Sequence, residues 1–336
     1  MECVLVTGGA GYIGSHTCKE LCRVGLLPVS YDNLTQGHRW AVRWGPLIVG
    51  DLAETALLTQ VLRENGIRSV VHFAAHAYVG ESMSNPGRYF RNNVSNTISL
   101  LEAMRAAGAD RLVFSSSCAT YGIPSQVPIT EECKQIPVNP YGESKLFVEK
   151  LLRWHGEAHG LRSIVLRYFN AAGADADGEI GEQHDPETHL IPLVIQAALR
   201  QRAAVRILGT DYPTPDGTCV RDYIHVSDLA RAHGIAVGYL AEGGATDVFN
   251  LGTGRGTSVL EVCGVVQRAL AKPVPVCHGT RREGDPPVLV ADAQKAGALL
   301  GWRPRFDIDA IVQTACEWAL GRHIDSVQHG LQGTQK

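Results

Sequence analysis

Residues 4–14 read VLVTGGAGYIG, an apolar run followed by glycines three apart at Gly8, Gly11 and Gly14. Between a strand and a helix, this spacing is typical of a dinucleotide-binding turn. The first glycine permits the tight turn, the second lets the backbone approach a pyrophosphate, and the third lets the helix pack on the sheet. The pyrophosphate would face unpaired N–H groups at the start of the helix. A tight turn without a ligand is the alternative interpretation.

An acidic residue follows the next apolar segment, as a dinucleotide site requires. Pro28 interrupts that segment, so the strand itself is expected over residues 29–31, directly before Asp32. A carboxylate at this point accepts hydrogen bonds from the adenosine ribose and repels a 2′-phosphate, which favours NAD over NADP. The alternative is that Asp32 and Asn33 only form a turn.

A second acid, Asp51, follows the short apolar segment 47–49. One interpretation is that its carboxylate reaches the adenine ring from the next crossover. The other is that it caps a helix beginning at Leu52, because aspartate is a preferred residue at that position. The two roles are compatible, and the sequence leaves both open.

Apolar segments alternate with helical patterns over the first 170 residues. This alternation predicts an α/β fold, in which helices cover both faces of a doubly wound parallel sheet. The expected strands are 2–7, 27–31, 47–49, 69–73, 112–115 and 163–168, and the expected helices are 12–24, 54–65, 89–107 and 141–155.

Beyond residue 170 the pattern changes to loops and shorter elements. The expected loops are 171–188 and 211–219, the helices are 226–240, 258–270 and 291–300, and a strand is expected at 248–251. We therefore expect a nucleotide-binding domain over 1–170, to which elements of about 220–250 return. A smaller, interleaved lobe is expected over 171–325, followed by a loose polar tail over 326–336.

Composition excludes several function classes. The formal net charge is −3 at pH 7, which argues against binding along a nucleic-acid backbone. No apolar run reaches about 18 residues and no basic leader begins the sequence, so neither a membrane span nor a signal peptide is expected. The nine cysteines are scattered without a Cys-x-x-Cys pair. Free thiols in a reducing cytoplasm are therefore expected, and no metal site.

Three histidines are candidate metal ligands by residue type, because histidine commonly binds metals. His72, His76 and His225 lie on or beside apolar strands and lack the helical spacing that would pair them with a carboxylate. Burial in the core is therefore favoured over metal binding for these three residues.

A Ser, Tyr and Lys combination points to chemistry at the same sheet edge. Ser115 and Ser117 close the fifth expected strand, at the carboxyl end where α/β sheets bind ligands. Tyr141 and Lys145 lie four residues apart, on one face of a helix. An ammonium near a phenol stabilises the phenolate, which makes Tyr141 a usable acid and base. A surface turn with a solvated lysine is the alternative.

These segments together resemble the extended short-chain dehydrogenase/reductases, and within them the UDP-glucose (UDP-galactose) 4-epimerases. The resemblance spans about residues 2–320. It rests on VTGGAGYIGSH, HFAAHAYVGES, FSSSCATYG, NPYGESK, LRYFNAAGA, DGTCVRDYIHVSDLA, FNLGTG and RREGDPP. It implies a Rossmann-type domain with tightly held NAD, a UDP-sugar lobe and a homodimer. It also implies 4-epimerisation through a 4-keto sugar, with transient reduction of NAD+ and no net redox change.

Carried over position by position, the resemblance implies a role for each matching residue. The implied catalytic residues are Ser117, Tyr141 and Lys145. The implied NAD-binding residues are Gly8, Gly11, Tyr12, Ile13, Gly14, Asp32, Asn33, Asp51, Leu52, Phe73, Ala74, Ala75, Asn92, Ser115, Tyr141, Lys145 and Tyr168. The implied substrate-binding residues are Ser117, Tyr141, Asn170, His189, Leu190, Leu208, Arg221, Arg282, Asp285 and Leu289.

Several positions depart from the pattern of some relatives. Ala77 stands where some have a cofactor-binding lysine, and His189 stands where some have asparagine, so that only its backbone is expected to contribute. Cys118 removes a hydroxyl, for which Ser117 alone or Thr120 compensates. Leu289 borders the sugar C2 substituent in the family, where its intermediate size leaves N-acetyl substrates open. Pentose substrates such as UDP-xylose also remain open. Leu289 is equally compatible with a plain core position.

Two other functions are possible on the same fold, and the sequence argues against both. A sugar-nucleotide 4,6-dehydratase would place acidic residues after the strand-end serine, where this chain has Cys118 and Ala119. A non-catalytic NAD sensor would not need the proton donor Tyr141. The helical segments 86–107 and 140–155 carry apolar residues on more than one face, which fits either a dimer interface or packing within one chain.

Overall fold

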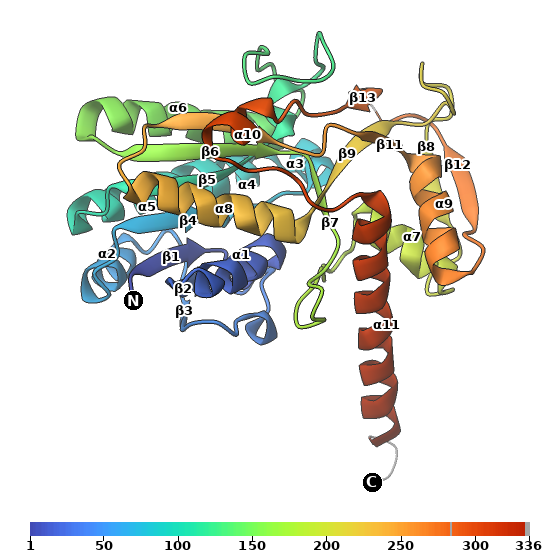
Figure 1. Ribbon diagram of the computed structural model, residues 1–336, viewed down its shortest axis with the longest axis horizontal. Helices are drawn as coiled ribbons and strands as arrows, with labels where there is room; N and C mark the ends of the chain where they lie inside the picture. The colour runs from blue at the N-terminus through green and yellow to red at the C-terminus, as the bar shows by residue number, and fades with distance from the viewer. Residues whose placement is uncertain (283, 333–336) are drawn as a thin grey trace.

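The computed structural model describes residues 1–282 and 284–332, with residues 322–332 as backbone alone. A seven-stranded sheet forms the larger half, with the strand order β10-β6-β5-β4-β1-β2-β3 and every neighbouring pair parallel (Figure 1). The predicted α/β doubly wound sheet is confirmed. Its strands are β1 Cys3–Thr7, β2 Leu27–Asp32, β3 Leu47–Val49, β4 Ser69–His72, β5 Arg111–Ser117, β6 Arg162–Tyr168 and β10 Asp247–Leu251.

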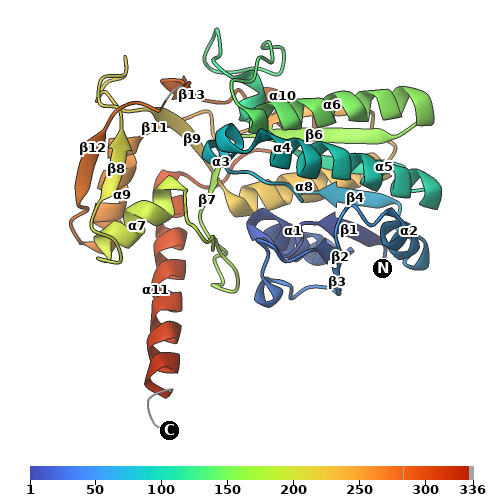
Figure 2. The same cartoon turned by 180° about the vertical axis from the view of Figure 1, so that it is seen from behind.

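Helices cover both faces of this sheet. Successive residues of β1 point to opposite faces, so Leu5 packs with α2, α5 and α6, whereas Val4 and Val6 pack with α1, α8 and α10. Figure 2 shows α5 and α6 side by side on one of these faces. These helices are α1 Tyr12–Arg23, α2 Thr55–Glu64, α5 Asn96–Ala107, α6 Pro140–His159, α8 Val226–Ala241 and α10 Gln294–Leu299.

Strand β2 continues through Pro28, so the prediction that the strand proper starts at Val29 was wrong. Pro28 pairs with Val4 of β1. The Ser30 amide donates to Pro46 on the β3 side, and β3 pairs only from Ser30 onward. Pro28 faces that same side before β3 begins. Its missing N–H therefore breaks no ladder bond, as at an edge strand.

The helix expected over 89–107 is three consecutive pieces: α4 Pro86–Tyr89, the π-helical turn η2 Phe90–Ser95, and α5, which ends at the left-handed Gly108. Single π-turns inside helices are frequent at functional sites, because the inserted residue redirects neighbouring side chains. Here the turn contains the predicted cofactor residue Asn92.

The smaller lobe is built around a second sheet. Strand β9 lies between β11 and β13, pairs also with β7, and a separate pair joins β12 and β8. Helices α7, α9 and α11 pack together in its core. The lobe strands are β7 Asn170–Ala172, β8 Val205–Leu208, β9 Val220–His225, β11 Gly256–Ser258, β12 Val276–Gly279 and β13 Val288–Leu289. The lobe helices are α7 Leu190–Ala198, α9 Val259–Leu270 and α11 Ile308–Gln332. Three short helical segments belong instead to connections of the main sheet: η1 Arg39–Ala41, α3 Val79–Ser84 and η3 Cys118–Tyr121.

Two boundaries differ from the sequence expectation. The chain returns to the main sheet with α8 and β10, whereas β9, expected among the returning elements, belongs to the lobe sheet. Helix α11 extends to Gln332, through much of the segment expected to be a loose tail (Figure 1). Residues 333–336 of that predicted tail lie outside the described residues. Across the described ranges, no helix is long and apolar enough to cross a membrane.

Candidate active site

The glycine turn fits closely between three strands. The Gly8 amide donates to Tyr31 of β2 at 2.8 Å, and Gly8 has a positive φ of 74°. A Cβ at Gly8 would lie 2.8 Å from the Ala74 amide nitrogen, and a Cβ at Gly14 would lie 2.1 Å from the Gly8 carbonyl oxygen. Larger residues at these positions would therefore break the contact between the turn, the β4 end and α1.

The start of α1 suits a pyrophosphate. Gly11 is the N-cap residue and makes no side-chain cap, so the first-turn amides that include Tyr12 and Ile13 have no capping side chain. Such amides and the helix dipole attract anions. A Cβ at Gly11 would approach no atom closer than the Gly8 carbonyl oxygen, at 3.3 Å. The open backbone at Gly11 is what a bound dinucleotide phosphate needs, so these residues fit NAD.

Asp32 is fixed at the end of β2. Its two carboxylate oxygens accept hydrogen bonds from the Ala10 amide at 3.0 Å and the Leu34 amide at 2.8 Å. Burial raises the pKa of Asp32, and these amides oppose that rise. The carboxylate is therefore held beside the glycine turn, in the place predicted for a ribose contact.

Asp51 does not cap α2, because that helix begins only at Thr55 and has Glu54 as its N-cap residue. Instead, one Asp51 oxygen accepts from the Ala53 amide at 2.9 Å, and the other accepts from the Asn33 side chain at 2.8 Å. The predicted residues Asn33 and Asp51 are thus joined directly, on the same sheet edge as Asp32. Leu52, which follows Asp51, is buried.

Ser117, Tyr141 and Lys145 converge at the carboxyl end of β5. Ser117 is the last residue of β5, and its hydroxyl accepts from the Ala119 amide at 3.1 Å. Tyr141 lies in the first turn of α6, and Asn139 caps that helix by accepting from the Gly142 amide at 2.8 Å. The buried Lys145 ammonium donates to the Ser115 carbonyl at 2.7 Å and lies 5.9 Å from the centre of the Tyr141 ring.

Electrostatics at these residues differs from the simple expectation that Lys145 lowers the pKa of Tyr141. Burial raises the pKa of Tyr141 well above its usual value, while its interaction with Ser117 works in the opposite direction. Burial also lowers the pKa of Lys145 to about 7, with the Glu149 charge opposing the change. The phenol and the amine are thus both held toward their neutral forms, and a further positive charge at the site is needed to favour phenolate.

The remaining residues predicted to bind the cofactor lie near the same edge. Tyr168, at the end of β6, forms a short hydrogen bond with the Ser115 hydroxyl. Phe73 follows β4 and packs its ring 4.6 Å from that of His233 in α8. Asn92 donates to the Asn93 side chain at 2.9 Å. Ala75 directly follows Ala74 and is only partly buried.

Sequence reasoning missed Asn93, the buried neighbour of Asn92. Its side chain accepts from the His76 amide at 2.8 Å and donates to the His76 carbonyl at 3.0 Å and the Ser144 hydroxyl at 2.9 Å. Asn93 therefore ties the segment after β4 to α6, directly beside Tyr141. The repeated Asn pair in the sequence was the only available signal.

Two of the predicted core histidines, His72 and His225, are buried and satisfied within the protein, whereas His76 is only partly buried, so the predicted core position was wrong for that residue. His72 bonds Thr7 at 2.7 Å and Thr97 at 2.9 Å, and His225 accepts from the Ser227 amide at 3.0 Å. The Thr120 hydroxyl donates to the Ser117 carbonyl at 2.9 Å. Thr120 therefore does not replace the side-chain hydroxyl that Cys118 removes.

The lobe brings three predicted substrate residues together. Arg221 is mostly buried and donates to the Asp285 carboxylate at 2.5 Å. Leu289 in β13 lies opposite Arg221 in the strand pairing. Leu289 also packs against the small apolar cluster that contains Cys118 and Phe169. Its position is thus both a core contact and a neighbour of the β5 end.

The other predicted substrate residues are spread more widely. Arg282 is exposed, and its side chain makes no hydrogen bond or ion pair within the described part of the chain; its carbonyl accepts from the Asp285 amide at 3.2 Å. Asn170 is exposed at the start of β7, and Leu208 is half-buried at the end of β8. His189 is the N-cap residue of α7, and Leu190 is its first residue.

Asp222, next to Arg221, was also missed. It is fully buried and accepts from the Thr253 amide at 2.8 Å, the Gly254 amide at 3.0 Å and the Ala291 amide at 3.2 Å. These bonds hold the loop after β10 and the segment after β13 against β9. Asp222 is therefore a positioning residue for the lobe, which its place in the VRDYIHV segment could have suggested.

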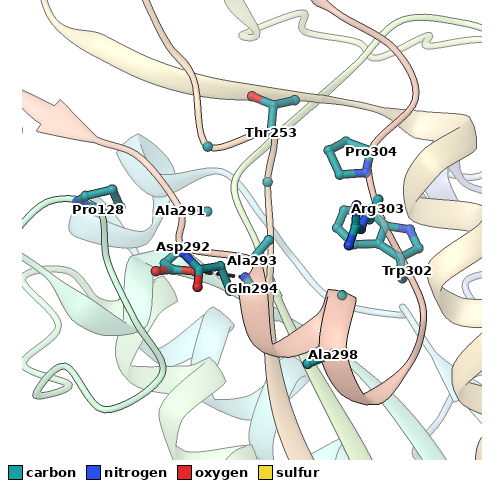
Figure 3. Close-up of a pocket in the computed structure, with 13 residues that line it drawn as sticks. Pro128, Thr253, Ala291, Asp292, Ala293, Gln294, Ala298, Trp302, Arg303 and Pro304 are labelled. Carbon is teal, nitrogen blue, oxygen red and sulfur yellow. Dashed lines mark hydrogen bonds between the residues drawn. The ribbon is translucent and has the colours of Figure 1, made fainter.

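A separate cavity of about 540 Å³ lies behind this arrangement, between the loop after β10 and α10 (Figure 3). Its wall includes Thr253, Ala291 and Arg303, and Asp292 at its rim accepts from the Gln294 amide at 2.8 Å. None of the predicted site residues lines it. We therefore assign the candidate active site to the carboxyl edge of the main sheet.

A dinucleotide-binding sheet with a Ser, Tyr and Lys set at its carboxyl edge defines the class of protein. This chain belongs to the NAD dependent epimerase/dehydratase family, whose model matches residues 4–252.

Within that family the chain is similar to UDP-glucose 4-epimerases. It is 52% identical over 315 residues to the UDP-glucose 4-epimerase of Rhizobium meliloti (strain 1021), covering 94% of this chain and 96% of the relative. The structure matches that of UDP-glucose 4-epimerase from Brucella ovis in complex with NAD, with a TM-score of 0.93, 52% identity and coverage of 94% and 98%. A Stenotrophomonas maltophila structure named UDP-glucose-4-epimerase, with bound NAD and formylated UDP-arabinopyranose, matches with a TM-score of 0.93, 39% identity and coverage of 96% and 100%.

Proposed function

We propose that this chain is an NAD-dependent UDP-sugar 4-epimerase that interconverts UDP-glucose and UDP-galactose without net redox change. The observation that carries the proposal is the convergence of Ser117, Tyr141 and Lys145 at the end of β5, on the same edge of the main sheet as the glycine turn. The high identity to relatives named UDP-glucose 4-epimerase supports the choice of substrate.

The side chains at the edge would divide the proton chemistry. Bound NAD+ supplies a hydride acceptor and donor, and its positive charge favours the ionised form of a nearby phenol. Tyr141 takes the proton from the sugar 4-hydroxyl and returns it to the same oxygen. Ser117, whose oxygen accepts from the Ala119 amide, keeps its own proton free to donate to that sugar oxygen. Lys145 places a positive charge beside the phenol whenever it is protonated.

The lobe would supply most of the binding energy. Arg221 and Arg282 suit a diphosphate, because guanidinium groups bind phosphate oxygens in pairs. Asp285 accepts from Arg221 and fixes its orientation. A 4-epimerase must present both faces of C4 to one acceptor, so the sugar has to turn within the site. Firm contacts to the remote UDP group and loose contacts to the hexose meet that requirement.

The direct test is proton NMR of the purified protein with UDP-galactose and no added cofactor. We expect UDP-glucose to appear, which requires both 4-epimerisation and NAD that stays bound through purification. A parallel sample with UDP-N-acetylglucosamine then defines how much room Leu289 leaves, and one with UDP-xylose tests the pentose alternative. No conversion of UDP-galactose, even after NAD+ is added, would contradict the glucose/galactose assignment.

We propose that the partner of this chain is a second copy of itself. Helix α6 carries exposed Phe147 and Trp154 one above the other, and α5 exposes Ile98. Phe90, in the η2 turn directly before α5, packs its ring 6.0 Å from that of Phe147 on α6 and extends this apolar surface. Such exposed apolar patches mark interaction surfaces. Light scattering should give a dimer mass for the natural chain and a monomer mass for Trp154→Glu; a natural chain that is already monomeric would contradict the dimer.

A reducing compartment, the cytoplasm, is the proposed location. All nine cysteines are free, and seven of them lie partly or wholly within the protein, where burial raises the pKa of thiols such as Cys18 and Cys118 to about 12. Unpaired, unreactive thiols are typical of reducing conditions.

A further inference from the structure

The segment between β7 and α7 crosses from the lobe to the glycine turn. The Gln183 carbonyl lies 3.1 Å from the His38 ring nitrogen, and the Trp318 indole donates to the Glu182 carbonyl at 3.0 Å. The Tyr12 hydroxyl, on the first residue of α1, donates to the Gly173 carbonyl at 2.6 Å. This segment therefore touches both halves of the molecule within a few residues of the cofactor side.

Four side chains of this segment meet at one point. We call them the His/Glu cluster: Glu182, His184, Glu187 and His189. Their ligand atoms all lie within 4.8 Å of one another. Both histidines present Nδ1 to the carboxylates, and the side chains of Glu182 and Glu187 are only 7% and 9% exposed. Two carboxylates so far removed from water need a cation between them.

The histidine–carboxylate spacing suits a small metal ion. The His184 Nδ1 atom lies 3.2 Å from Glu182 Oε1 and 3.6 Å from Glu187 Oε2, and the His189 Nδ1 atom lies 2.8 Å from Glu182 Oε1 and 3.0 Å from Glu187 Oε1. Around a tetrahedral Zn²⁺ with bonds of about 2.0–2.2 Å, neighbouring ligand atoms lie about 3.4 Å apart. The observed separations bracket that value.

Ion pairing alone leaves the cluster incompletely satisfied. The His184 Nδ1 atom is buried and has no partner in hydrogen-bonding geometry, although two carboxylates lie within 4 Å of it. It therefore faces the space between the carboxylates and not the lone pair of either one. A metal ion at the centre would use that nitrogen directly, because imidazole and carboxylate together suit Zn²⁺ and related transition metals.

In a neighbouring acidic cluster, by contrast, a lysine of the protein supplies the positive charge. Asp175, Asp177 and Glu179 surround the Lys19 ammonium at 2.8, 2.7 and 2.9 Å. Lys19 fills the centre of that cluster and leaves no room for a metal there. Within the part of the chain that the structure describes, no lysine or arginine forms an ion pair with Glu182 or Glu187.

The backbone around the cluster is arranged to orient a ligand. One Glu187 oxygen accepts from the Thr188 amide at 2.7 Å and the His189 amide at 2.8 Å. The His184 ring packs edge-on against Tyr12 at 6.3 Å and Tyr78 at 6.1 Å. Outer contacts of this kind fix the direction of metal ligands.

We propose that the His/Glu cluster binds one divalent transition-metal ion, Zn²⁺ in the cell, with tetrahedral geometry. Four protein ligands close the coordination sphere, so the ion is structural and not catalytic. Its role is to fasten the segment that joins the glycine turn to α7. With its side chain on the metal, His189 contributes only backbone to the substrate. The inference replaces the expectation of no metal site, and it does not depend on the proposed epimerase activity.

The test uses the full chain with any affinity tag removed, since a histidine tag would bind metal itself. The protein is stripped with a chelator, dialysed, and titrated with Co²⁺, whose visible absorption distinguishes tetrahedral from octahedral coordination. We expect saturation at one Co²⁺ per chain, a tetrahedral spectrum, and its loss when Zn²⁺ is added. Metal analysis of the protein before stripping should find about one Zn²⁺ per chain.

Two variants locate the ion. His184→Phe keeps an aromatic ring against Tyr12 and Tyr78 but lacks the nitrogen, and we expect metal affinity to fall at least about a hundredfold. His159→Phe, on the exposed end of α6, is the matched control and should bind as the natural chain does. Glu187→Gln gives a second readout if His184→Phe folds poorly.

Absence of a saturable Co²⁺ spectrum in the natural chain would overturn the proposal, as would equal binding by both histidine variants. The cluster would then be a set of imidazolium–carboxylate pairs. In that state burial opposes the charge, but the nearby carboxylates of Glu182 and Glu187 raise the pKa of His184 to about 9. Spectrum and metal content do not require turnover, so this outcome is independent of the epimerase assay.

Discussion

The two halves of the molecule hold their functional residues in different ways. In the sheet half, Ser117 and Lys145 are buried and bonded to backbone atoms of β5 or of the turn that follows it. In the lobe half, Arg221 of β9 donates to the Val220 carbonyl at 2.8 Å and also to the Asp285 side chain, whereas Arg282 is exposed on a loop. Backbone atoms position the chemistry, whereas the groups for binding depend also on a side-chain pair and a loop.

This difference fits the demands of the proposed reaction. Proton transfer needs groups placed within hydrogen-bonding reach of one oxygen. The end of a strand provides such placement because the sheet already fixes its backbone. Binding a nucleotide tolerates adjustment, because several contacts share the energy. Changes in the sheet half should therefore act on kcat, and changes in the lobe half should act on KM and on the choice of sugar.

Tyr141→Phe should give the largest effect. The phenol oxygen is the proton acceptor and donor, so its removal should lower kcat about a hundredfold to ten-thousandfold while the NAD content per chain stays unchanged. NMR turnover and NAD released by acid denaturation measure the two quantities. Tyr239→Phe, on α8 away from the site, is the control. Unchanged turnover in Tyr141→Phe would remove this residue from the mechanism.

Lys145→Met should show how much burial of the Lys145 amine lowers the free energy of unfolding. Burial holds the folded-state pKa of Lys145 at about 7, below its ordinary 10.5. Between these values the unfolded chain binds one more proton, so the natural chain gains stability as pH rises from 7 to 10.5. The variant should therefore be more stable than the natural chain near pH 7, by on the order of 3 kcal/mol. This advantage should disappear toward pH 10.5.

Urea unfolding of the NAD-free protein at several pH values measures this slope. Lys150→Met, on the exposed face of the same helix, is the matched control: it keeps Lys145, so its stability should rise with pH as that of the natural chain does. A difference between Lys145→Met and the natural chain that is constant with pH would show that the ammonium is not penalised in the folded state.

Arg221→Ala should act mainly on substrate binding. A charge-assisted hydrogen bond contributes about 1.5–3 kcal/mol, so loss of the guanidinium should raise KM for the UDP-sugar roughly tenfold to a hundredfold with a smaller change in kcat. Steady-state kinetics separates the two constants. Arg281→Ala removes an exposed arginine that pairs with Asp211, and should leave KM nearly unchanged. A fall in kcat alone for Arg221→Ala would contradict the division between the halves.

Leu289→Tyr should have the smallest effect and the most specific one. Leu289 lies opposite Arg221 and touches the cluster beside the β5 end, so a larger ring should narrow the space beside the sugar. We expect the activity on UDP-N-acetylglucosamine relative to UDP-glucose to fall about tenfold, since single contacts in such pockets contribute about 1–3 kcal/mol. Competition assays with both sugars give the ratio. An unchanged ratio would leave Leu289 as a core residue only.

Much of the sheet half could be predicted from sequence because its signals are local. The glycines, the acid after β2 and the period of apolar residues each report on a few neighbouring positions, and the strands and helices through residue 170 follow them closely. The errors arose where tertiary context mattered. Pro28 fits within β2 only because β3 starts later, and Asn93 acts through a π-helical turn that periodicity cannot distinguish from an α-helix.

The lobe was harder to predict, because its elements are short and depend on partners far along the chain. Strand β13 has two residues and forms only beside β9. Asp222 acquires its role by accepting from the Thr253 and Ala291 amides. The His/Glu cluster was equally hidden, since its residues occupy a loop with no regular period. The family resemblance identified the lobe residues by their positions in the sequence but did not predict their contacts.

The interleaving of the two halves constrains how such a protein can change. After β6 the chain forms β7 and the lobe, comes back as α8 and β10, leaves again, and passes the main sheet once more as α10. No single cut separates the halves, so neither is a gene segment that recombination can exchange as a unit. New sugar preferences in this architecture should therefore accumulate through single substitutions at positions such as Leu289, with the redox half inherited intact.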